Sequence, residues 1–313
     1  MKSLRILCPA KINAFLAVTG RRTDGFHDLV SLVLPLDWGD DLEVRMVTGG
    51  TEGVRIDCTD PEVPTGPDNL VWKAAEAFNR EAGLRHQYRF VLTKRIPMGA
   101  GLGGGSSDAV GALVAMNRLA GEPLDEGAMC ALAARLGSDC PLFLHGGPVI
   151  MRGRGERVEA APEGFCRSLK DRKVLLFKPA FSIGTAWAYG ELARCGSGGC
   201  MEEAQAEDRI RAILATPSRL PELGFNSFES VVGGKFPAIP LLLERLRAMR
   251  SGYVLMSGSG SACFAMGDTS SDLDPLRETI QECWGEWGVL EVAGFGLCRS
   301  NSVPLGMDGG TSA

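Results

Sequence analysis

The segment Pro97-Met-Gly-Ala-Gly-Leu-Gly-Gly-Gly-Ser-Ser-Asp108 (the phosphate loop below) carries the strongest structural signal in the chain. Five of the seven residues from Gly99 to Gly105 are glycine, which lets a backbone adopt positive φ angles and approach a ligand closely. Ser106, Ser107 and Asp108 stand where the N-cap of an amphipathic helix belongs. Unpaired N–H groups and the positive end of the helix dipole make such a start an anion site. The segment therefore predicts phosphate binding, with hydroxyls that contact phosphate or Mg²⁺.

Neither a linker nor a better-known phosphate motif accounts for these glycines as well. A flexible linker would not normally pass straight into a capped amphipathic helix. The spacing Gly99-x-Gly101-x-x-Gly104 matches the dinucleotide fingerprint, but polar residues separate it from the preceding strand, and no apolar strand precedes Glu122. Gly234-Lys235 is followed by Phe236, so a phosphate motif ending in Lys-Ser or Lys-Thr is absent from the sequence.

The remaining sequence mixes short strands and helices, which favours an α+β fold over a doubly wound sheet. A polar region near 160–172 marks the expected domain boundary, giving domains 1–165 and 166–313. The loop 195–199 and the tail 301–313 are expected to be flexible. Strands are predicted at 5–8, 15–18, 30–36, 42–47, 88–92, 142–144, 149–151, 174–177, 253–256, 262–266 and 290–296, and helices at 68–80, 109–120, 124–136, 204–216, 239–250 and 273–284.

Composition and charge exclude several classes of protein. Apolar residues make up 45% and charged residues 23% of the 313 positions, an ordinary soluble globular balance. The net charge of −5 and the lack of a basic stripe argue against nucleic acid or an anionic membrane as a partner. The ten cysteines form no CxxC pair, so reduced thiols in a cytoplasmic protein are expected. The sequence leaves monomer and homodimer open.

Two further segments accompany the phosphate loop. Pro9-Ala-Lys-Ile-Asn13 (the first motif) lies near the N-terminus, and Met256-Ser-Gly-Ser-Gly-Ser-Ala262 (the third motif) lies near the C-terminus. Together, and in this order, the three segments resemble the motifs of the GHMP kinases. The resemblance extends over nearly the whole chain and implies an ATP-dependent, Mg²⁺-dependent small-molecule kinase. It also implies an N-terminal domain like ribosomal protein S5 domain 2 and a ferredoxin-like C-terminal domain, with the active site between them.

The resemblance assigns two catalytic roles. Phosphoryl transfer requires positioning, charge neutralisation and a route for the hydroxyl proton. Asp139, in Leu136-Gly-Ser-Asp139-Cys-Pro141, matches the family's catalytic aspartate and is expected to act as general base, although a lone Asp before Pro is more often a turn residue. Lys11 matches the partner lysine, which would keep Asp139 ionised and stabilise the attacking oxygen. Because the two are far apart in sequence, we predict that the fold brings them together.

A narrower resemblance concerns the substrate. The run Thr19-Gly-Arg-Arg-Thr-Asp-Gly-Phe-His-Asp28 is similar to members of the family that phosphorylate the 2-hydroxyl of a cytidine-diphosphate-linked methylerythritol in the non-mevalonate route to isoprenoids. Phe26 and Tyr189 match two rings that stack on cytosine, a contact that contributes about 1–3 kcal/mol per base, and His27 matches a hydrogen-bonding partner of that base.

The full set of site residues implied by the resemblance falls into three groups. The ATP site comprises Asn69, Lys94, Pro97, Gly99, Ala100, Gly101, Leu102, Gly103, Gly104, Gly105, Ser106 and Ser107. The substrate site comprises Asn13, Phe26, His27, Thr185, Tyr189, Gly258, Ser259 and Gly260. Mg²⁺ would arrive with ATP, and Ser107 is the candidate protein ligand.

Two positions depart from the family pattern, and two rival functions remain open. Asp108 stands where Asn is frequent, and Asn226-Ser-Phe-Glu229 stands where Asn-Asp-aromatic-Glu is frequent. The rivals are another GHMP kinase, of the homoserine or mevalonate type, and a catalytically silent regulator with the same fold. The Asp-Gly-Phe-His run disfavours the first, and the presence of Lys11 and Asp139 disfavours the second.

Overall fold

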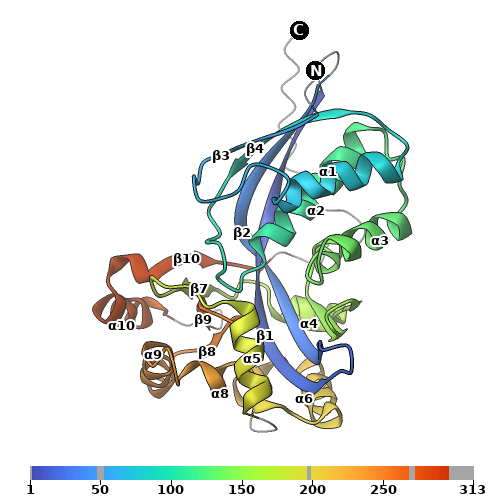
Figure 1. The fold of residues 1–313 in the computed structure, drawn as a ribbon. Coiled ribbons are helices and arrows are strands. Elements are labelled where there is room, and N and C mark those ends of the chain that lie inside the picture. The colour runs from blue at the N-terminus through green and yellow to red at the C-terminus, as the bar shows by residue number, and fades with distance from the viewer. Residues whose placement is uncertain (1, 48–52, 196–198, 268–271, 296–313) are drawn as a thin grey trace.

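The computed structural model describes residues 2–47, 53–195, 199–267 and 272–295 (Figure 1). The predicted tail at 301–313 lies outside these residues, as do most of the predicted loop at 195–199 and the last residue of the predicted strand at 290–296. Within the described residues, no helix is long and apolar enough to cross a membrane.

A long antiparallel hairpin forms the spine of the molecule. β1 (Lys2–Arg21) and β2 (His27–Val47) pair along their length and run from one end of the structure to the other (Figure 1). The sequence predicts four short strands here, and the structure joins them into two. Register shifts, including one between Pro9 and Lys11, absorb the irregular residues without ending the ladder.

The hairpin belongs to a six-stranded sheet with the order β3-β4-β2-β5-β6, in which β1 also pairs with β2. The other strands are β3 (Val54–Cys58), β4 (Gln87–Thr93), β5 (Val149–Gly153) and β6 (Arg157–Ala160). Three helices pack together beside this sheet: α1 (Leu70–Glu81), α2 (Gly104–Leu119) and α3 (Glu126–Leu136) (Figure 1). α2 is buried from Ser107 to Met116, whereas its first residues, Gly104 to Ser106, are partly or fully exposed.

The second half of the chain contains a four-stranded antiparallel sheet with the order β10-β7-β9-β8. Its strands are β7 (Val174–Phe177), β8 (Tyr253–Met256), β9 (Cys263–Met266) and β10 (Val289–Ala293). The helices of this half are α4 (Glu163–Ser168), α5 (Thr185–Arg194), α6 (Glu203–Ala215), α7 (Leu220–Leu223), α8 (Glu229–Val232), α9 (Ala238–Ala248) and α10 (Asp274–Trp284).

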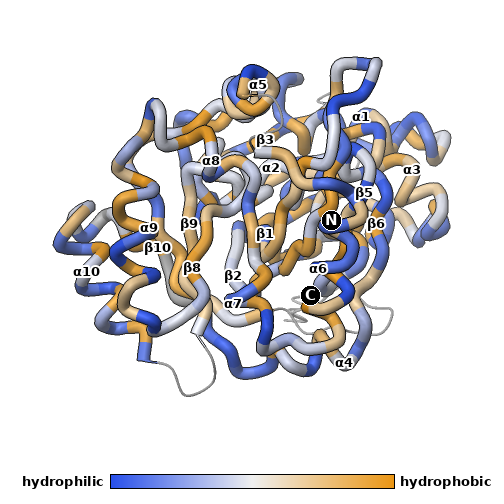
Figure 2. The backbone as a smooth tube through the Cα atoms, turned by 90° about the horizontal axis from the view of Figure 1, so that it is seen from below, coloured by the Kyte–Doolittle hydropathy of each residue, from blue (hydrophilic) through white to orange (hydrophobic). Residues whose placement is uncertain are grey.

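The hairpin packs against both halves of the chain. Phe15 and Leu34 from its middle share one core with Leu176, Leu255 and Phe264 from the second sheet. Figure 2 shows the same arrangement as hydrophobic stretches along β1, β8 and β9 in the interior. The α+β class predicted from the sequence is therefore confirmed, while the division at 165/166 stays a proposal.

Two local predictions are wrong. Residues Pro141–Leu144 form a 3₁₀ helix, η1, because Pro141 fixes φ for a helical start, so the strand predicted at 142–144 is absent. α2 begins at Gly104 because Gly103 adopts a left-handed conformation with φ of 76°. The residues from Ser106 to Asp108 consequently lie inside the first turns of the helix rather than at its N-cap.

Candidate functional site

The three sequence motifs meet at the phosphate loop. The backbone N–H of Lys11, in the first motif, donates to Leu102 O at 2.9 Å. The hydroxyl of Ser257, in the third motif, donates to Gly101 O at 3.0 Å. Segments from the start, middle and end of the chain are thus joined directly by hydrogen bonds.

Gly101 lies where only glycine fits. Its φ is 79°, and a Cβ at this position would lie 2.3 Å from Ser257 O. Residues that carry a Cβ rarely adopt this φ, and the third motif leaves no room for a Cβ at this position. The close approach of the loop and the third motif therefore depends on this glycine.

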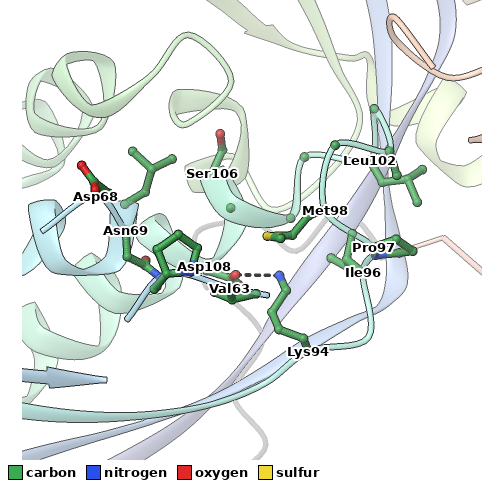
Figure 3. A pocket seen from close by; sticks show the side chains of 18 residues that line it. Val63, Asp68, Asn69, Lys94, Ile96, Pro97, Met98, Leu102, Ser106 and Asp108 are labelled. Atoms are coloured by element: carbon green, nitrogen blue, oxygen red, sulfur yellow. Dashed lines mark hydrogen bonds and ion pairs between the residues drawn. The ribbon is translucent and has the colours of Figure 1, made fainter. Parts of the chain in front are cut away.

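A cavity of about 360 Å³ opens along the phosphate loop (Figure 3). All the residues assigned to the ATP site from the resemblance line it, except Ser107. Asn69 has its side chain engaged in the fold, because it caps α1 by accepting from Val71 N and also donates to Pro64 O. The sequence did not assign Val63, Pro64, Asp68, Leu70, Ile96, Met98 or Asp108, which also line the cavity.

The start of α2 is suited to a phosphate or a phosphate-bound cation. The Ser107 hydroxyl is buried and has no hydrogen-bond partner among the described residues. A buried hydroxyl without a partner is unfavourable unless a ligand or water supplies one. The positive end of the helix dipole at Gly104 adds to this preference for an anion. The Ser107 hydroxyl therefore has the chemistry for a contact with ATP phosphate or its Mg²⁺, although Ser107 does not itself line the cavity.

Lys94 lies in a buried cluster of charges beside this cavity. Its ammonium donates to Asp40. It also donates to Asp108 Oδ2 at 2.9 Å (Figure 3). The second oxygen of Asp108 has no hydrogen-bond partner among the residues described. Burial raises the pKa of the Asp108 carboxyl to about 7; Lys94 opposes this rise and Asp40 adds to it. A carboxylate near a phosphate site repels the phosphate, and both the contact with Lys94 and the raised pKa of Asp108 reduce this repulsion.

This pKa predicts a pH-dependent stability. The unfolded Asp108 would titrate near 4 and the folded one at about 7, so the stabilisation is complete below pH ~4 and is lost as pH rises through ~7. The variant Asp108→Asn lacks this loss. Between pH 5 and 8, we expect the unfolding free energy of the wild type to fall by about 1–3 kcal/mol relative to the variant. Urea unfolding in EDTA, without nucleotide, measures this, and parallel pH curves would contradict it.

The predicted catalytic pair lies on the other side of the phosphate loop. Lys11 Nζ is 3.8 Å from Asp139 Oδ2 and donates to Asn13 Oδ1 at 2.6 Å. Lys11 is buried, whereas the side chain of Asp139 is 43% exposed. Burial lowers the pKa of Lys11 and Asp139 opposes this effect. The fold therefore places a buried cation beside a carboxylate that a ligand can reach.

Helix ends position Asp139. α3 ends at Leu136 with Gly137 as its C-cap, and η1 begins at Pro141, so the short segment between them carries the aspartate. Lys11 comes from β1, at the register shift that follows Pro9. Two rigid elements, rather than long loops, thus hold the pair together.

A smaller cavity of about 150 Å³ contains this pair and many of the predicted substrate contacts. Asn13, Thr185, Tyr189, Gly258 and Ser259 all line it, as do Gly101 and Gly103 of the phosphate loop. The Thr185 and Ser259 hydroxyls are 3.0 Å apart. Gly260, Phe26 and His27 are not among the lining residues.

The aromatic residues extend from this cavity toward the surface. The rings of His27 and Tyr189 stack with centroids 5.0 Å apart. Phe26 is 55% exposed, and the Arg154 guanidinium lies 5.0 Å from its centroid. Burial lowers the pKa of His27, and the charge of Arg21 adds to this effect, which favours a neutral imidazole. His27 and Tyr189 thus lie together, whereas Phe26 stands at the outer edge.

The segment that departs from the family pattern supports the third motif. Asn226 Nδ2 donates to Met256 O at 2.7 Å and to Gly258 O at 2.9 Å. The hydroxyl of Ser227 accepts from Val18 N at 2.9 Å. Serine at this position is therefore accommodated by the hairpin.

Sequence reasoning missed several residues of the site. Ser31 accepts from Asn13 Nδ2 at 2.9 Å, and Phe228 packs edge-on against Tyr189. Asp40 binds Lys94 from a strand 54 positions earlier. Ser31 and Asp40 lie outside the motifs, and a buried strand residue gives no local sign of its partner. Phe228 is the aromatic residue of the segment Asn226-Ser-Phe-Glu229, but that segment alone does not show that its ring packs on Tyr189.

Two family models match parts of this chain. A family model described as the GHMP kinases N terminal domain matches residues 69–147, and one described as GHMP kinases C terminal matches residues 210–286. A protein of Geobacter sp. (strain M21) named 4-diphosphocytidyl-2-C-methyl-D-erythritol kinase is 34% identical, covering 91% of this chain and 97% of the relative. A Synechococcus sp. (strain CC9311) protein of the same name is 35% identical, covering 91% and 94%.

Solved structures with the same fold also match this chain. A crystal structure of 4-(cytidine 5'-diphospho)-2C-methyl-D-erythritol kinase has a TM-score of 0.73 and 32% identity, and the match covers 94% of this chain and 99% of that one. A homoserine kinase from Cytophaga hutchinsonii also has a TM-score of 0.73, with coverage of 95% and 96%, but its identity is 17%. The second match therefore shows the fold alone.

Proposed function

Since this chain belongs to the GHMP kinase family, we propose that it transfers the γ-phosphate of ATP to the 2-hydroxyl of 4-diphosphocytidyl-2-C-methyl-D-erythritol. One observation carries the proposal: Lys11 and Asp139 lie in the same cavity as Gly101 and Gly103 of the phosphate loop. Relatives named for this reaction match more than nine-tenths of the chain, which supports the choice of substrate.

The reaction follows from the placement of these groups. The substrate hydroxyl lies near Asp139, which accepts its proton as the oxygen attacks the γ-phosphorus. The bond from that phosphorus to the bridging oxygen of ATP breaks, and ADP leaves. Lys11 stabilises the negative charge on the attacking oxygen, and amides at the start of α2 stabilise the transferred phosphoryl group.

Further parts of the proposal concern the setting of the reaction. Mg²⁺ would be bound mainly by ATP, with the Ser107 hydroxyl as its contact from this chain, and would neutralise phosphate charge. We place the boundary between the ATP-binding and C-terminal domains at 165/166 and the protein in the cytoplasm. The protein acts as a monomer or a homodimer, with no nucleic-acid or membrane partner.

The proposed cytidine contact gives a testable substitution. Phe26→Ala removes an exposed ring, so the fold should tolerate it. We expect KM for the cytidine substrate to rise by about 5- to 150-fold, the equivalent of one lost stacking contact, while KM for ATP changes little. Leu241→Ala, which removes another exposed apolar side chain, is the control. Equal changes in both KM values would contradict a role in binding the base.

A panel of acceptors tests the function itself. ADP release is measured with Mg-ATP and the cytidine compound, homoserine, mevalonate or galactose. Turnover with the cytidine compound alone is the expected result. Turnover with another acceptor would support the assignment as a kinase but contradict the proposed substrate. ATP binding without turnover would favour a catalytically silent regulator.

A further inference from the structure

Asp40 binds three consecutive residues at the entrance of the phosphate loop. It lies on β2 with no exposed surface. Its Oδ1 accepts from the backbone N–H of Arg95 at 2.5 Å and of Ile96 at 2.8 Å, and its Oδ2 accepts from the Lys94 ammonium. One carboxylate thus holds the segment that connects β4 to the glycines.

The number of donors explains how this charge is buried. A carboxylate inside a protein is costly unless it is paired and hydrogen-bonded, and Asp40 has both a cation and two amides. The Lys94 side chain is 6% exposed and also binds Asp108. Its ammonium has three N–H groups, two of which are used in this way. The remaining one is available to a ligand in the cavity that Lys94 lines.

Lys94 is also close to the helix start. A Cβ at Gly104 would lie 3.2 Å from Lys94 Nζ, so the ammonium is beside the first residue of α2. A shift of Lys94 would therefore move its positive charge. It would also alter the surface at the start of α2, where phosphates are expected to bind. Asp40, from a separate strand, sets the position of this cation.

We propose that Asp40 is a positioning residue of the nucleotide site, which holds Lys94 and the entrance of the phosphate loop in the ATP-binding geometry before ATP arrives. The inference rests on the proposed function, because it takes this cavity to be the ATP site. A site that is ordered in advance loses less conformational freedom on binding. Asp40 itself touches no substrate and acts through Lys94 and the loop backbone.

The substitution Asp40→Asn separates the hydrogen bonds that Asp40 accepts from the loop backbone from its ion pair with Lys94. The amide oxygen can still accept from Arg95 N and Ile96 N, but the NH₂ group then faces the Lys94 ammonium, donor against donor. We expect KM for ATP to rise by about 10- to 100-fold, the effect of losing a charged hydrogen bond. We expect kcat and KM for the cytidine substrate to stay within about threefold of the wild type.

The adjacent Asp41 supplies a matched control. Asp41 forms an exposed ion pair with the Arg95 side chain, and such pairs contribute little. Asp41→Asn should therefore leave KM for ATP unchanged. If Asp40→Asn also leaves it unchanged, or only lowers Tm and kcat, the residue is merely structural and the proposal is overturned.

A measurement on the wild type is independent of whether the variant folds. Hydrogen exchange of the Arg95 and Ile96 amides should be slow without nucleotide and change little when a non-hydrolysable ATP analogue is added. Fast exchange that slows only with the analogue would overturn the proposal. If the wild type binds the analogue but phosphorylates no acceptor, the proposed function fails. The proposal for Asp40 can still be tested in that case, because calorimetric titration compares the affinities of Asp40→Asn and Asp41→Asn for the analogue.

Discussion

Asp139→Asn should lower kcat by about 10²–10⁴-fold, the range that a positioned general base contributes. Asparagine keeps the size of the side chain but cannot accept the hydroxyl proton. The side chain of Asp139 is 43% exposed and its 3.8 Å contact with Lys11 is a long ion pair, so the fold should tolerate the change. KM for ATP should stay nearly constant, because Asp139 does not line the nucleotide cavity. Steady-state kinetics with both substrates and a calorimetric ATP titration measure these effects.

Asp125→Asn provides the control for this substitution. Asp125 caps α3 by accepting from Ala128 N at 2.8 Å, and asparagine is an equally good cap. Its kcat should equal that of the wild type. If Asp139→Asn lost ATP binding together with kcat, the aspartate would be a structural residue, and the proposed chemistry would have to change.

Gly101→Ala should weaken ATP binding and the fold together. A methyl group here would lie 2.3 Å from Ser257 O, at a φ of 79° that costs alanine about 1–3 kcal/mol even without a clash. To accommodate it, the phosphate loop must separate from the third motif and lose the hydrogen bond from the Ser257 hydroxyl. We expect a lower Tm and a KM for ATP at least about tenfold higher, since 1.4 kcal/mol is a factor of ten.

Gly105→Ala is the matched control, within the same loop. A Cβ at Gly105 would meet only Leu70, at an ordinary 3.8 Å. It lies inside α2, where alanine is favoured over glycine, so Tm should be unchanged or higher. Equal losses of Tm in the two variants would show that the close contact at Gly101 does not hold the loop.

The sequence predicts local features well where one segment carries the signal. The phosphate loop, α1 and α3 follow from glycine content and apolar spacing, and α3 ends at Leu136, the last residue of the predicted helix. The start of α2 is missed because apolar spacing starts only after the glycines, whereas the turn depends on the backbone of Gly103. The length of β1 and β2 is missed because bulges interrupt the pattern without ending the strands.

The site depends on contacts that no single segment reveals. The meeting of Lys11 with Asp139 follows only from the family resemblance, since nothing near either residue in the sequence identifies its partner. Asp40 has no counterpart in the motifs, and only the pairing of β2 with β4 brings it to Lys94. Phe26 and His27, adjacent in sequence, differ in setting because only His27 reaches Tyr189.

The most direct test is a ³¹P NMR spectrum of one reaction, with the protein, Mg-ATP and 4-diphosphocytidyl-2-C-methyl-D-erythritol. We expect the γ-phosphate signal of ATP to disappear as the signals of ADP and one new phosphomonoester appear, with the diphosphate of the substrate intact. Asp139→Asn should give almost none of this product in the same time. Release of inorganic phosphate alone, or no change in the spectrum with folded wild-type protein, would show that the chain does not catalyse this transfer.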